Sequence, residues 1–325
     1  MRLLVTGGAG FIGSNFVRRV LSAKTSDITS ITVLDKLTYA GVLENLDPVS
    51  KLENFKFIQG DICDFQLVTK LLQDVDAVVN FAAESHVDRS INGAMDFVQT
   101  NIVGVQVLLD AIKNSNKKIR FVQVSTDEVY GSIASGSWTE DSPLLPNSPY
   151  SASKAGGELL ARAYFKTHNL DVVITRCSNN YGPYHFPEKM IPLFITNLLE
   201  GKKVPLYGDG LNVRDWLHVD DHCNGILKVL LNGRSGEIYN IGGGSELNNL
   251  ELTNIILKAM GTDSSSIEYV EDRKGHDLRY SVNHQKITNE LGYQPQVDFS
   301  DGLAETIKWY KENRAWWETL KTGRN

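Results

Sequence analysis

Cysteine is scarce in this chain of 325 residues, and the three that occur, Cys63, Cys177 and Cys223, form no C-x-x-C pair. An odd number of thiols without paired spacing argues against a disulfide framework and against a cysteine-based zinc site. We therefore expect a protein of a reducing compartment, and predict a cytoplasmic location.

Long apolar runs and an excess of positive charge are lacking too. No stretch approaches the ~20 apolar residues that cross a bilayer, and the chain starts without the apolar run of a signal peptide. Lys and Arg number 33 against 39 Asp and Glu, a formal net charge of -6. Because nucleic-acid affinity depends on clustered cations, we expect neither a nucleic acid nor a membrane as partner. An anionic ligand would need a local basic pocket.

What the chain does have is 42% hydrophobic residues, enough for a substantial core. Short apolar runs alternate with helical patterns in its first half, and we expect strands at 3–5, 31–34, 55–58, 77–80, 121–124 and 172–174. This alternation predicts an α/β fold with a doubly wound, parallel (Rossmann-type) sheet. Beyond about Tyr181 the alternation weakens, which favours a smaller C-terminal α/β lobe for a substrate.

A glycine-rich turn separates the first expected strand from the first expected helix. Gly8, Gly10 and Gly13 satisfy G-x-G-x-x-G, while Gly7, Gly10 and Gly13 satisfy the wider G-x-x-G-x-x-G. Glycines there let backbone N–H groups approach a pyrophosphate at the positive end of the helix. Because glycines after a strand are often only a turn, the prediction of a dinucleotide site depends on the next strand along the chain.

The second expected strand supplies that context by ending at Asp35. A carboxylate at this place accepts hydrogen bonds from ribose hydroxyls and repels a 2′-phosphate, which favours NAD over NADP. Lys36, directly after it, weakens the preference. We predict a dinucleotide site of the NAD type.

A helix with a tyrosine and a lysine on one face is expected from residue 149 onward. Ser148 can cap it, with Pro149 at its first position, and Tyr150 and Lys154 lie four residues apart. A lysine ammonium and a positive nicotinamide ring near a phenol would lower the pKa of the phenol and make it a base for an alcohol proton. The same spacing occurs on ordinary helix surfaces, so this interpretation depends on the glycine turn upstream.

Two adjacent carboxylates lie just after the fifth expected strand, in the triplet Thr126, Asp127 and Glu128. Open parallel sheets bind ligands at the carboxyl ends of their strands, so the pair is expected to face a substrate. The alternative is a solvated loop pair without a chemical role.

These features together resemble a known superfamily. The glycine turn, Asp35, the stretches NFAAESHVDRS and VSTDEVYGS, and Tyr150 with Lys154 resemble the extended short-chain dehydrogenase/reductases. Within them, the acidic triplet and the stretches CSNNYGPY, PEKMIP, PLYGDG and DRKGHDLRY resemble the dTDP-glucose 4,6-dehydratase family over nearly the whole chain.

The resemblance implies NAD as cofactor and dTDP-glucose as substrate. In this family C4 of the hexose is oxidised, water leaves across C5 and C6, and hydride returns to C6, which yields dTDP-4-keto-6-deoxyglucose for deoxysugar biosynthesis. It further implies an NAD-binding Rossmann domain over residues 1–180 and a sugar-nucleotide-binding lobe over 181–325, although segments can cross between the two.

The resemblance also assigns roles. Glu128 is the base for the C5 proton, Asp127 the acid for the C6 oxygen, and Thr126 bonds near the C4 oxygen; Tyr150 and Lys154 serve the redox step. The implied cofactor residues are Gly7, Gly10, Phe11, Ile12, Gly13, Asp35, Lys36, Thr38, Asp61, Ile62, Ala82, Ala83, Thr100, Tyr150, Lys154 and Asn180. The implied substrate residues are Ser85, Thr126, Asn179, Glu188, Lys189, Pro205, Tyr207, Arg214, Asn249, Arg273 and His276.

Some of these residues also have ordinary structural explanations. Asp61 and Ala82 could simply end strands, Thr100 could lie on a helix surface, and Arg214 and Arg273 could form surface ion pairs. Asn179 and Asn180 are expected to end the sixth strand.

Three histidines outside the main motifs are assigned to structure. His86 could act as a base, but a hydrogen-bonding role is favoured. His218 and His222 in HVDDH have the spacing of metal ligands. We predict no metal, and interpret the run as a strand end, an aspartate cap and a helix start.

The family resemblance further implies a homodimer, in which helices near 100–114 and 150–167 of each copy pair into a four-helix bundle. Gly156 and Gly157 motivate this expectation, because glycine inside a helix costs roughly 0.8–1 kcal/mol each unless backbones approach closely. Close packing on the chain's own sheet would explain them equally well.

Two other functions compete with the dehydratase. An NAD-dependent sugar-nucleotide epimerase is disfavoured by Asp127 and Glu128, since elimination of water needs an acid and a base whereas inversion of a hydroxyl does not. A non-catalytic NAD-sensing module is disfavoured by Tyr150 and Lys154, since a sensor needs no base.

Overall fold

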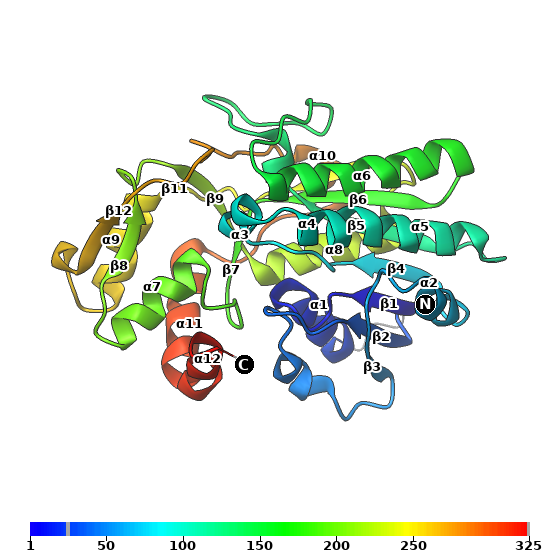
Figure 1. Ribbon diagram of the computed structural model, residues 1–325, viewed down its shortest axis with the longest axis horizontal. Helices are drawn as coiled ribbons and strands as arrows, with labels where there is room; N and C mark the ends of the chain where they lie inside the picture. Colours follow the sequence, from blue (N-terminus) through cyan, green and yellow to red (C-terminus); the bar gives the residue numbers. More distant parts are fainter. Residues whose placement is uncertain (24–26, 324–325) are drawn as a thin grey trace.

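The central element of the computed structural model, which describes residues 1–23 and 27–323, is a seven-stranded parallel sheet of order β10-β6-β5-β4-β1-β2-β3 (Figure 1). Its strands are β1 Arg2–Thr6, β2 Ser30–Asp35, β3 Phe55–Gln59, β4 Ala77–Asn80, β5 Arg120–Thr126, β6 Val172–Cys177 and β10 Ile238–Ile241. All six strands expected from the sequence are present, so the predicted Rossmann-type sheet is confirmed.

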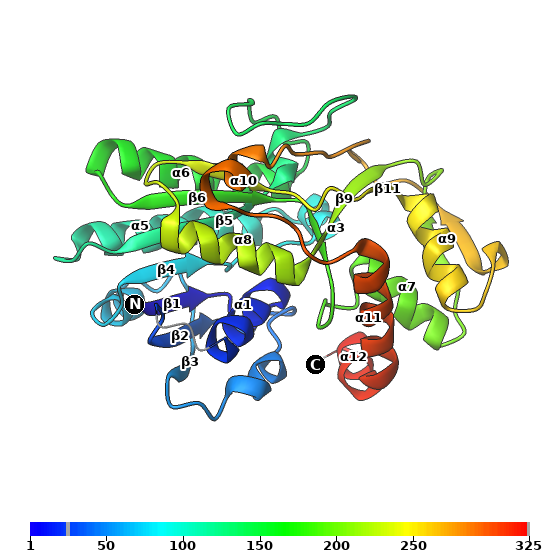
Figure 2. The ribbon, with the colours of Figure 1, turned by 180° about the vertical axis from the view of Figure 1, so that it is seen from behind.

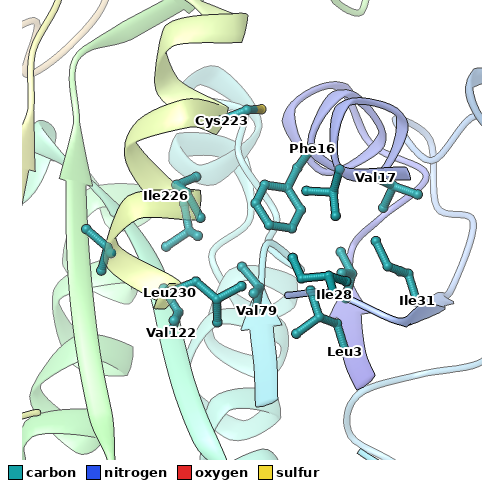
Figure 3. Close-up of a cluster of buried hydrophobic side chains, with 14 of the residues drawn as sticks. Leu3, Phe16, Val17, Ile28, Ile31, Val79, Val122, Cys223, Ile226 and Leu230 are labelled. Atoms are coloured by element: carbon teal, nitrogen blue, oxygen red, sulfur yellow. The ribbon is translucent and has the colours of Figure 1, made fainter. Parts of the chain in front are cut away.

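Helices cover both faces of this sheet, which is why its inner strands are almost uniformly apolar. One face carries α1 Phe11–Ser22 and α8 Val219–Asn232; the other carries α2 Phe65–Leu72, α5 Val105–Asn114 and α6 Pro149–His168. Figure 2 shows α8 in front of the sheet, opposite the side on which Figure 1 shows α5 and α6. In Figure 3, Phe16 of α1 and Ile226 of α8 pack above Leu3 and Val79 of the strands.

Shorter elements complete this half of the chain. They are η1 Leu43–Val49, α3 Val87–Asn92, α4 Met95–Val98, the π-helical segment η2 Gln99–Gly104 and the 3-10 turn η3 Asp127–Tyr130. The helix expected near 100–114 is therefore composite. Its π turn shifts the phase of the side chains, and Val103 is exposed while Ile112 is buried.

A smaller α/β lobe lies beside the carboxyl ends of the large sheet (Figure 1). It contains a three-stranded sheet of β7 Asn179–Tyr181, β9 Val213–His218 and β11 Glu246–Asn248, and a pair of β8 Val204–Tyr207 with β12 Ile267–Val270. Around them lie η4 Ser264–Ser266 and the helices α7 Met190–Leu199, α9 Asn249–Ala259, α11 Phe299–Glu312 and α12 Arg314–Lys321. They share a third apolar core with the fully buried Trp317.

Several segments of the second half belong to the large sheet. β10 extends it beside β6, α8 covers it, and α10 Gln285–Leu291 packs on β10 and α8. Two local expectations are wrong: Asn179 and Asn180 form β7 rather than ending β6, and His218 rather than an aspartate caps α8, through its bond from the Asp220 backbone N–H. The first difference arises because the chain leaves the large sheet after β6 and enters the smaller one, where β7 pairs with β9.

Gly156 and Gly157 have a different explanation from the two that the sequence suggested. A Cβ on Gly157 would lie 2.3 Å from the carbonyl oxygen of Asn101, and one on Gly156 would lie 2.9 Å from the side chain of Ile102. The two glycines therefore allow η2 of the same chain to pack closely against α6. They no longer support a dimer, which this single chain does not test.

Within residues 1–23 and 27–323, no helix has the length and apolar character needed to span a bilayer.

Candidate active site

A cleft of about 540 Å³ opens at the carboxyl ends of the large sheet, between it and the smaller lobe. Every residue that the sequence assigned to catalysis, cofactor or substrate lines this one cleft. The structure thus brings together residues that lie between positions 7 and 276 of the sequence. The individual roles of these residues stay predictions.

At one end of the cleft, the glycine turn packs against neighbouring backbone too closely for any larger residue. Gly7 has φ +68°, and a Cβ on it would lie 2.5 Å from the backbone nitrogen of Ala82; a Cβ on Gly13 would lie 2.3 Å from the Gly7 carbonyl oxygen. Among the described residues, no side chain caps the start of α1, at Gly10. The first N–H groups of this helix are therefore free to bind a pyrophosphate.

Asp35 lies at the carboxyl end of β2, beside this turn. Its Oδ2 accepts a bond from the Ala9 backbone N–H at 2.9 Å and its Oδ1 one from Leu37 at 2.8 Å, while burial raises the pKa of the carboxyl. Lys36 does not oppose it, because the Lys36 Nζ lies 2.7 Å from the Asp61 Oδ2. The glycine cradle and the buried carboxylate fit the predicted dinucleotide.

The acidic triplet forms the middle of the cleft. Thr126 ends β5 and caps η3, where its Oγ1 accepts from the Glu128 backbone N–H at 3.3 Å and donates to the Asp127 Oδ1 at 3.3 Å. Asp127 is only 2% exposed, and its Oδ2 has no hydrogen-bond partner within the described part of the chain.

The two carboxyls have different electrostatic surroundings. Burial, then the negative charges of Glu128 and Asp215, raise the pKa of Asp127 well above its ordinary value. Burial also raises the pKa of Glu128, but the cations of Arg214, Lys189 and Arg273 oppose that rise. Asp127 is therefore the one that holds its proton, and Glu128 the one that gives its proton up more readily.

Tyr150 and Lys154 line the same cleft from α6, whose start is closed by a capping box between Ser148 and Ser151. Both are buried, and the Lys154 Nζ donates to the Val124 carbonyl oxygen at 2.7 Å. Burial lowers the pKa of Lys154 to about 8. Burial, together with Glu128 and other nearby acidic groups, raises the pKa of Tyr150 well above 10.

The predicted lowering of the Tyr150 pKa depends on a nicotinamide ring as well as on Lys154, so it stays a prediction. In the protein by itself the Lys154 ammonium bonds to a main-chain carbonyl, and burial raises the pKa of the phenol. A positive ring beside the phenol would act in the opposite direction from burial.

Three cations gather at the far end of the cleft from separate elements. The Lys189 Nζ donates to the Ser85 carbonyl oxygen at 2.7 Å. Arg214, on β9, donates to the carbonyl oxygens of Val213 at 2.8 Å and of Asp277 at 3.0 Å. These bonds hold cationic side chains that an acidic protein needs in order to bind an anion.

The third cation, Arg273, contacts α3 through Asp88 at this end of the cleft. The Arg273 Nε lies 3.2 Å from the Asp88 Oδ1, and its guanidinium lies 5.1 Å from the centre of the Tyr207 ring. The His276 Nδ1 lies 2.6 Å from the Asp272 Oδ1, on the same loop. Arg214 is thus a buried cleft residue, and Arg273 forms its ion pair with Asp88 at the lining of the cleft.

His86 agrees with its predicted structural role. It caps α3 by accepting a bond from the Arg89 backbone N–H at 3.4 Å, and its Nε2 lies 3.6 Å from the Glu188 carboxylate. Burial lowers the pKa of His86 to about 4, so the ring is neutral near pH 7.

Sequence reasoning missed an aromatic loop, residues 183–188, that covers the cofactor end from the smaller lobe. His185 stacks on Phe11 of the glycine turn, with ring centres 4.2 Å apart, and Tyr184 lies under the Arg18 guanidinium at 4.1 Å. Phe186 meets Tyr39 edge to face at 5.6 Å. The only signal was the run of aromatic residues after CSNN, whose partners lie more than a hundred residues earlier.

Comparisons with known proteins agree with this geometry. The family described as GDP-mannose 4,6 dehydratase matches residues 4–306. A dTDP-glucose 4,6-dehydratase of Streptomyces niveus is 58% identical over 324 residues, which cover 99% of this chain and 96% of that protein. The crystal structure of DesIV, a dTDP-glucose 4,6-dehydratase from Streptomyces venezuelae with NAD and TYD bound, has a TM-score of 0.97 and 62% identity, and covers 98% of this chain and 100% of its own.

Epimerases are more distant. A UDP-glucuronic acid 4-epimerase from Bacillus cereus, in complex with UDP-glucuronic acid and NAD, has a TM-score of 0.89 and 32% identity, over 96% of this chain and 99% of its own.

Proposed function

We propose a function from the premise that this chain belongs to the GDP-mannose 4,6 dehydratase family: it catalyses the NAD-dependent dehydration of dTDP-glucose to dTDP-4-keto-6-deoxyglucose. One observation carries the proposal, namely that buried Asp127 and partly buried Glu128 line the same cleft as Tyr150 and Lys154. The relatives at 58% identity and above bear this activity in their names.

NAD binds at the glycine end of the cleft. The N–H groups at the start of α1 hold its pyrophosphate, and Asp35 accepts hydrogen bonds from a ribose. When bound, NAD accepts a hydride from C4 of the sugar and returns it to C6. Since no net hydride is lost, we expect NAD to stay with the protein through purification.

The nucleotide diphosphate binds at the cationic end. Arg214 and Arg273 supply planar guanidinium groups for phosphate oxygens, and Lys189 supplies a point charge. Arg273 forms an ion pair with Asp88 in the protein without ligand. When the diphosphate binds, the Arg273 guanidinium therefore contacts both Asp88 and the phosphate oxygens.

The redox step belongs to Tyr150, which takes the proton of the C4 hydroxyl as hydride leaves C4. Lys154 stabilises the resulting phenolate through its positive charge. Thr126, which caps η3, lies between this pair and the two carboxyls and bonds near the C4 oxygen.

Elimination then uses the two carboxyls. Glu128 removes the C5 proton, which the C4 ketone has made acidic, and Asp127 gives its proton to the C6 hydroxyl so that it leaves as water. Hydride returns to C6 while Glu128 returns its proton to C5, and the proton taken by Tyr150 replaces through solvent the one that Asp127 gave. Atoms and charges then balance to the loss of one water.

Incubation of the purified protein with dTDP-glucose tests the proposal. We expect the product to lose the mass of one water and to show a methyl group at C6 by NMR, with no build-up of NADH. An isomer of unchanged mass would identify an epimerase instead, and an unchanged sugar with bound NAD would identify a sensor. Tyr150→Phe, with the cleft otherwise intact, is the control.

Three coarser expectations complete the proposal. The chain divides near residue 180 into an NAD-binding and a sugar-nucleotide-binding part, with β10, α8 and α10 crossing over. It acts in the cytoplasm, where its free thiols stay reduced. It forms a homodimer in which the helices near 100–114 and 150–167 of each copy pair into a four-helix bundle, and exposed Val103 and Leu159 on these helices offer apolar side chains.

A further inference from the structure

A buried polar network lies behind the cleft, outside the residues that line it. Four side chains from four elements form it: Tyr130 of η3, Glu158 of α6, Arg176 of β6 and Asn240 of β10. All four are at most 3% exposed. The reaction proposed above uses none of them.

Arg176 is the centre of this network. Its Nε lies 3.2 Å from both carboxylate oxygens of Glu158, and one terminal nitrogen lies 2.5 Å from the Glu158 Oε1. The other terminal nitrogen donates to the Tyr130 hydroxyl at 2.6 Å. The guanidinium thus joins α6 to η3 with charge-assisted bonds.

The Tyr130 hydroxyl links Arg176 to Asn240 of β10. It donates to the Asn240 Oδ1 at 2.9 Å, and the backbone N–H of Asn240 donates to the Glu140 carboxylate at 2.9 Å. The Tyr130 ring also stacks on Trp138, with centres 5.9 Å apart. Tyr130 is therefore held both at its hydroxyl and at its ring.

The position of this network gives it a function. Tyr130 ends the short turn that contains Asp127 and Glu128. Glu158 lies four residues after Lys154 and eight after Tyr150, on the same side of α6. The network therefore ties the turn that bears the elimination pair to the helix that bears the redox pair.

We propose that the Tyr130 hydroxyl, held by the Arg176–Glu158 pair, is a positioning group that sets the distance between the elimination pair and the redox pair. The inference rests on the proposed function. One sugar must place C4 at Tyr150 and C5 and C6 at Glu128 and Asp127, so both pairs need a fixed separation. A misplacement of about 1 Å can cost about 10²-fold in rate.

Tyr130→Phe tests this positioning role, because it removes one oxygen and keeps the ring. With dTDP-glucose in a single turnover, we expect NADH to form nearly as in the wild type, since Tyr150 and Lys154 lie on the intact α6. Loss of water should slow by about 10²-fold, so that NADH accumulates during steady turnover. Exchange of the C5 hydrogen with deuterated water should slow in parallel.

Tyr293→Phe is the matched control. Tyr293 is fully buried, its hydroxyl donates to the Gly242 carbonyl oxygen at 3.1 Å, and neither residue lines the cleft. It should lose thermal stability like Tyr130→Phe but keep the wild-type ratio of oxidation to elimination.

Arg176→Lys is the second variant, for the case in which Tyr130→Phe does not fold. It keeps the charge opposite Glu158 but cannot reach both Glu158 and Tyr130, and it should shift the ratio in the same direction. The positioning role would be overturned if the rates of oxidation and elimination fell together. It would also be overturned if the ratio of oxidation to elimination stayed unchanged in both variants. A wild type that leaves dTDP-glucose unchanged would refute the proposed function instead.

Discussion

The two ends of the cleft are built on different principles. In the proposed function, the cofactor end uses the glycine turn and Asp35, which lie within the first βαβ unit, and it recognises NAD largely through backbone N–H groups. The proposed substrate end uses charged side chains, such as Arg214 and Arg273, from elements far apart in the chain. The first end depends on local geometry and the second on tertiary packing, so substitutions should affect them separately.

The largest effects are expected between the two ends. Glu128→Gln should still oxidise C4, with NADH visible by absorbance, but should fail to exchange the C5 hydrogen with deuterated water. In Asp127→Asn the base remains, so exchange should persist while elimination falls by about 10²–10⁴-fold. Exchange at the wild-type rate in Glu128→Gln would show that another group, such as His86, is the base.

The pH dependence of elimination should separate the same two carboxyls. Glu128 must be ionised, so the rate falls as pH drops through its raised pKa; Asp127 must be protonated, so the rate falls as pH rises through its own, higher pKa. We expect a bell-shaped profile of kcat/KM, with a slope of about tenfold per pH unit on each limb. Asp127→Asn should lose the alkaline limb that this group sets, and an unchanged limb would exclude Asp127 as the acid.

At the substrate end, Arg214→Gln should weaken dTDP binding by about 1.5–3 kcal/mol, the contribution of a charge-assisted hydrogen bond. NAD affinity should stay the same, because Arg214 lies on β9 of the smaller lobe. Calorimetry with dTDP and with NAD measures both. If dTDP and NAD binding were weakened equally, the two ends of the cleft would not be independent.

The matching test at the cofactor end is Asp35→Ala. Loss of its carboxylate should weaken NAD binding by about 1.5–3 kcal/mol and leave dTDP binding unchanged. Asp74→Ala, which removes a carboxylate with 91% of its side chain exposed, is the control. NAD affinity equal to the control would remove Asp35 from the site.

The smallest effect on either end is expected from the proposed dimer face. Leu159→Arg places a charge on a side chain that is 53% exposed on α6. It should convert a dimer to a monomer by light scattering at micromolar concentration while ligand affinities change little. A wild type that is already monomeric would contradict the dimer.

The contrast between the two ends also explains how far sequence reasoning reached. The strands, the glycine turn, Asp35 and the Ser148 cap can be predicted from patterns a few residues long, and the structure contains them all. The contacts of the aromatic loop with His185 could not be predicted from its run of aromatic residues, because its partner Phe11 lies in another lobe. The close packing of Gly156 could not be predicted locally either, because Ile102 of η2, which packs against it, lies more than fifty residues earlier.

The sequence by itself determined the fold class, and it predicted the cofactor end and the reacting groups. Hydrophobic periodicity and turn chemistry act between near neighbours, so they can be recognised in one stretch of chain. Only the tertiary structure decided that β10 joins the large sheet, that Lys154 bonds Val124, and that the Oδ2 of Asp127 is buried without a partner among the described residues. Burial and charge at a side chain depend on segments far away in sequence, and they set the pKa values on which the chemistry depends.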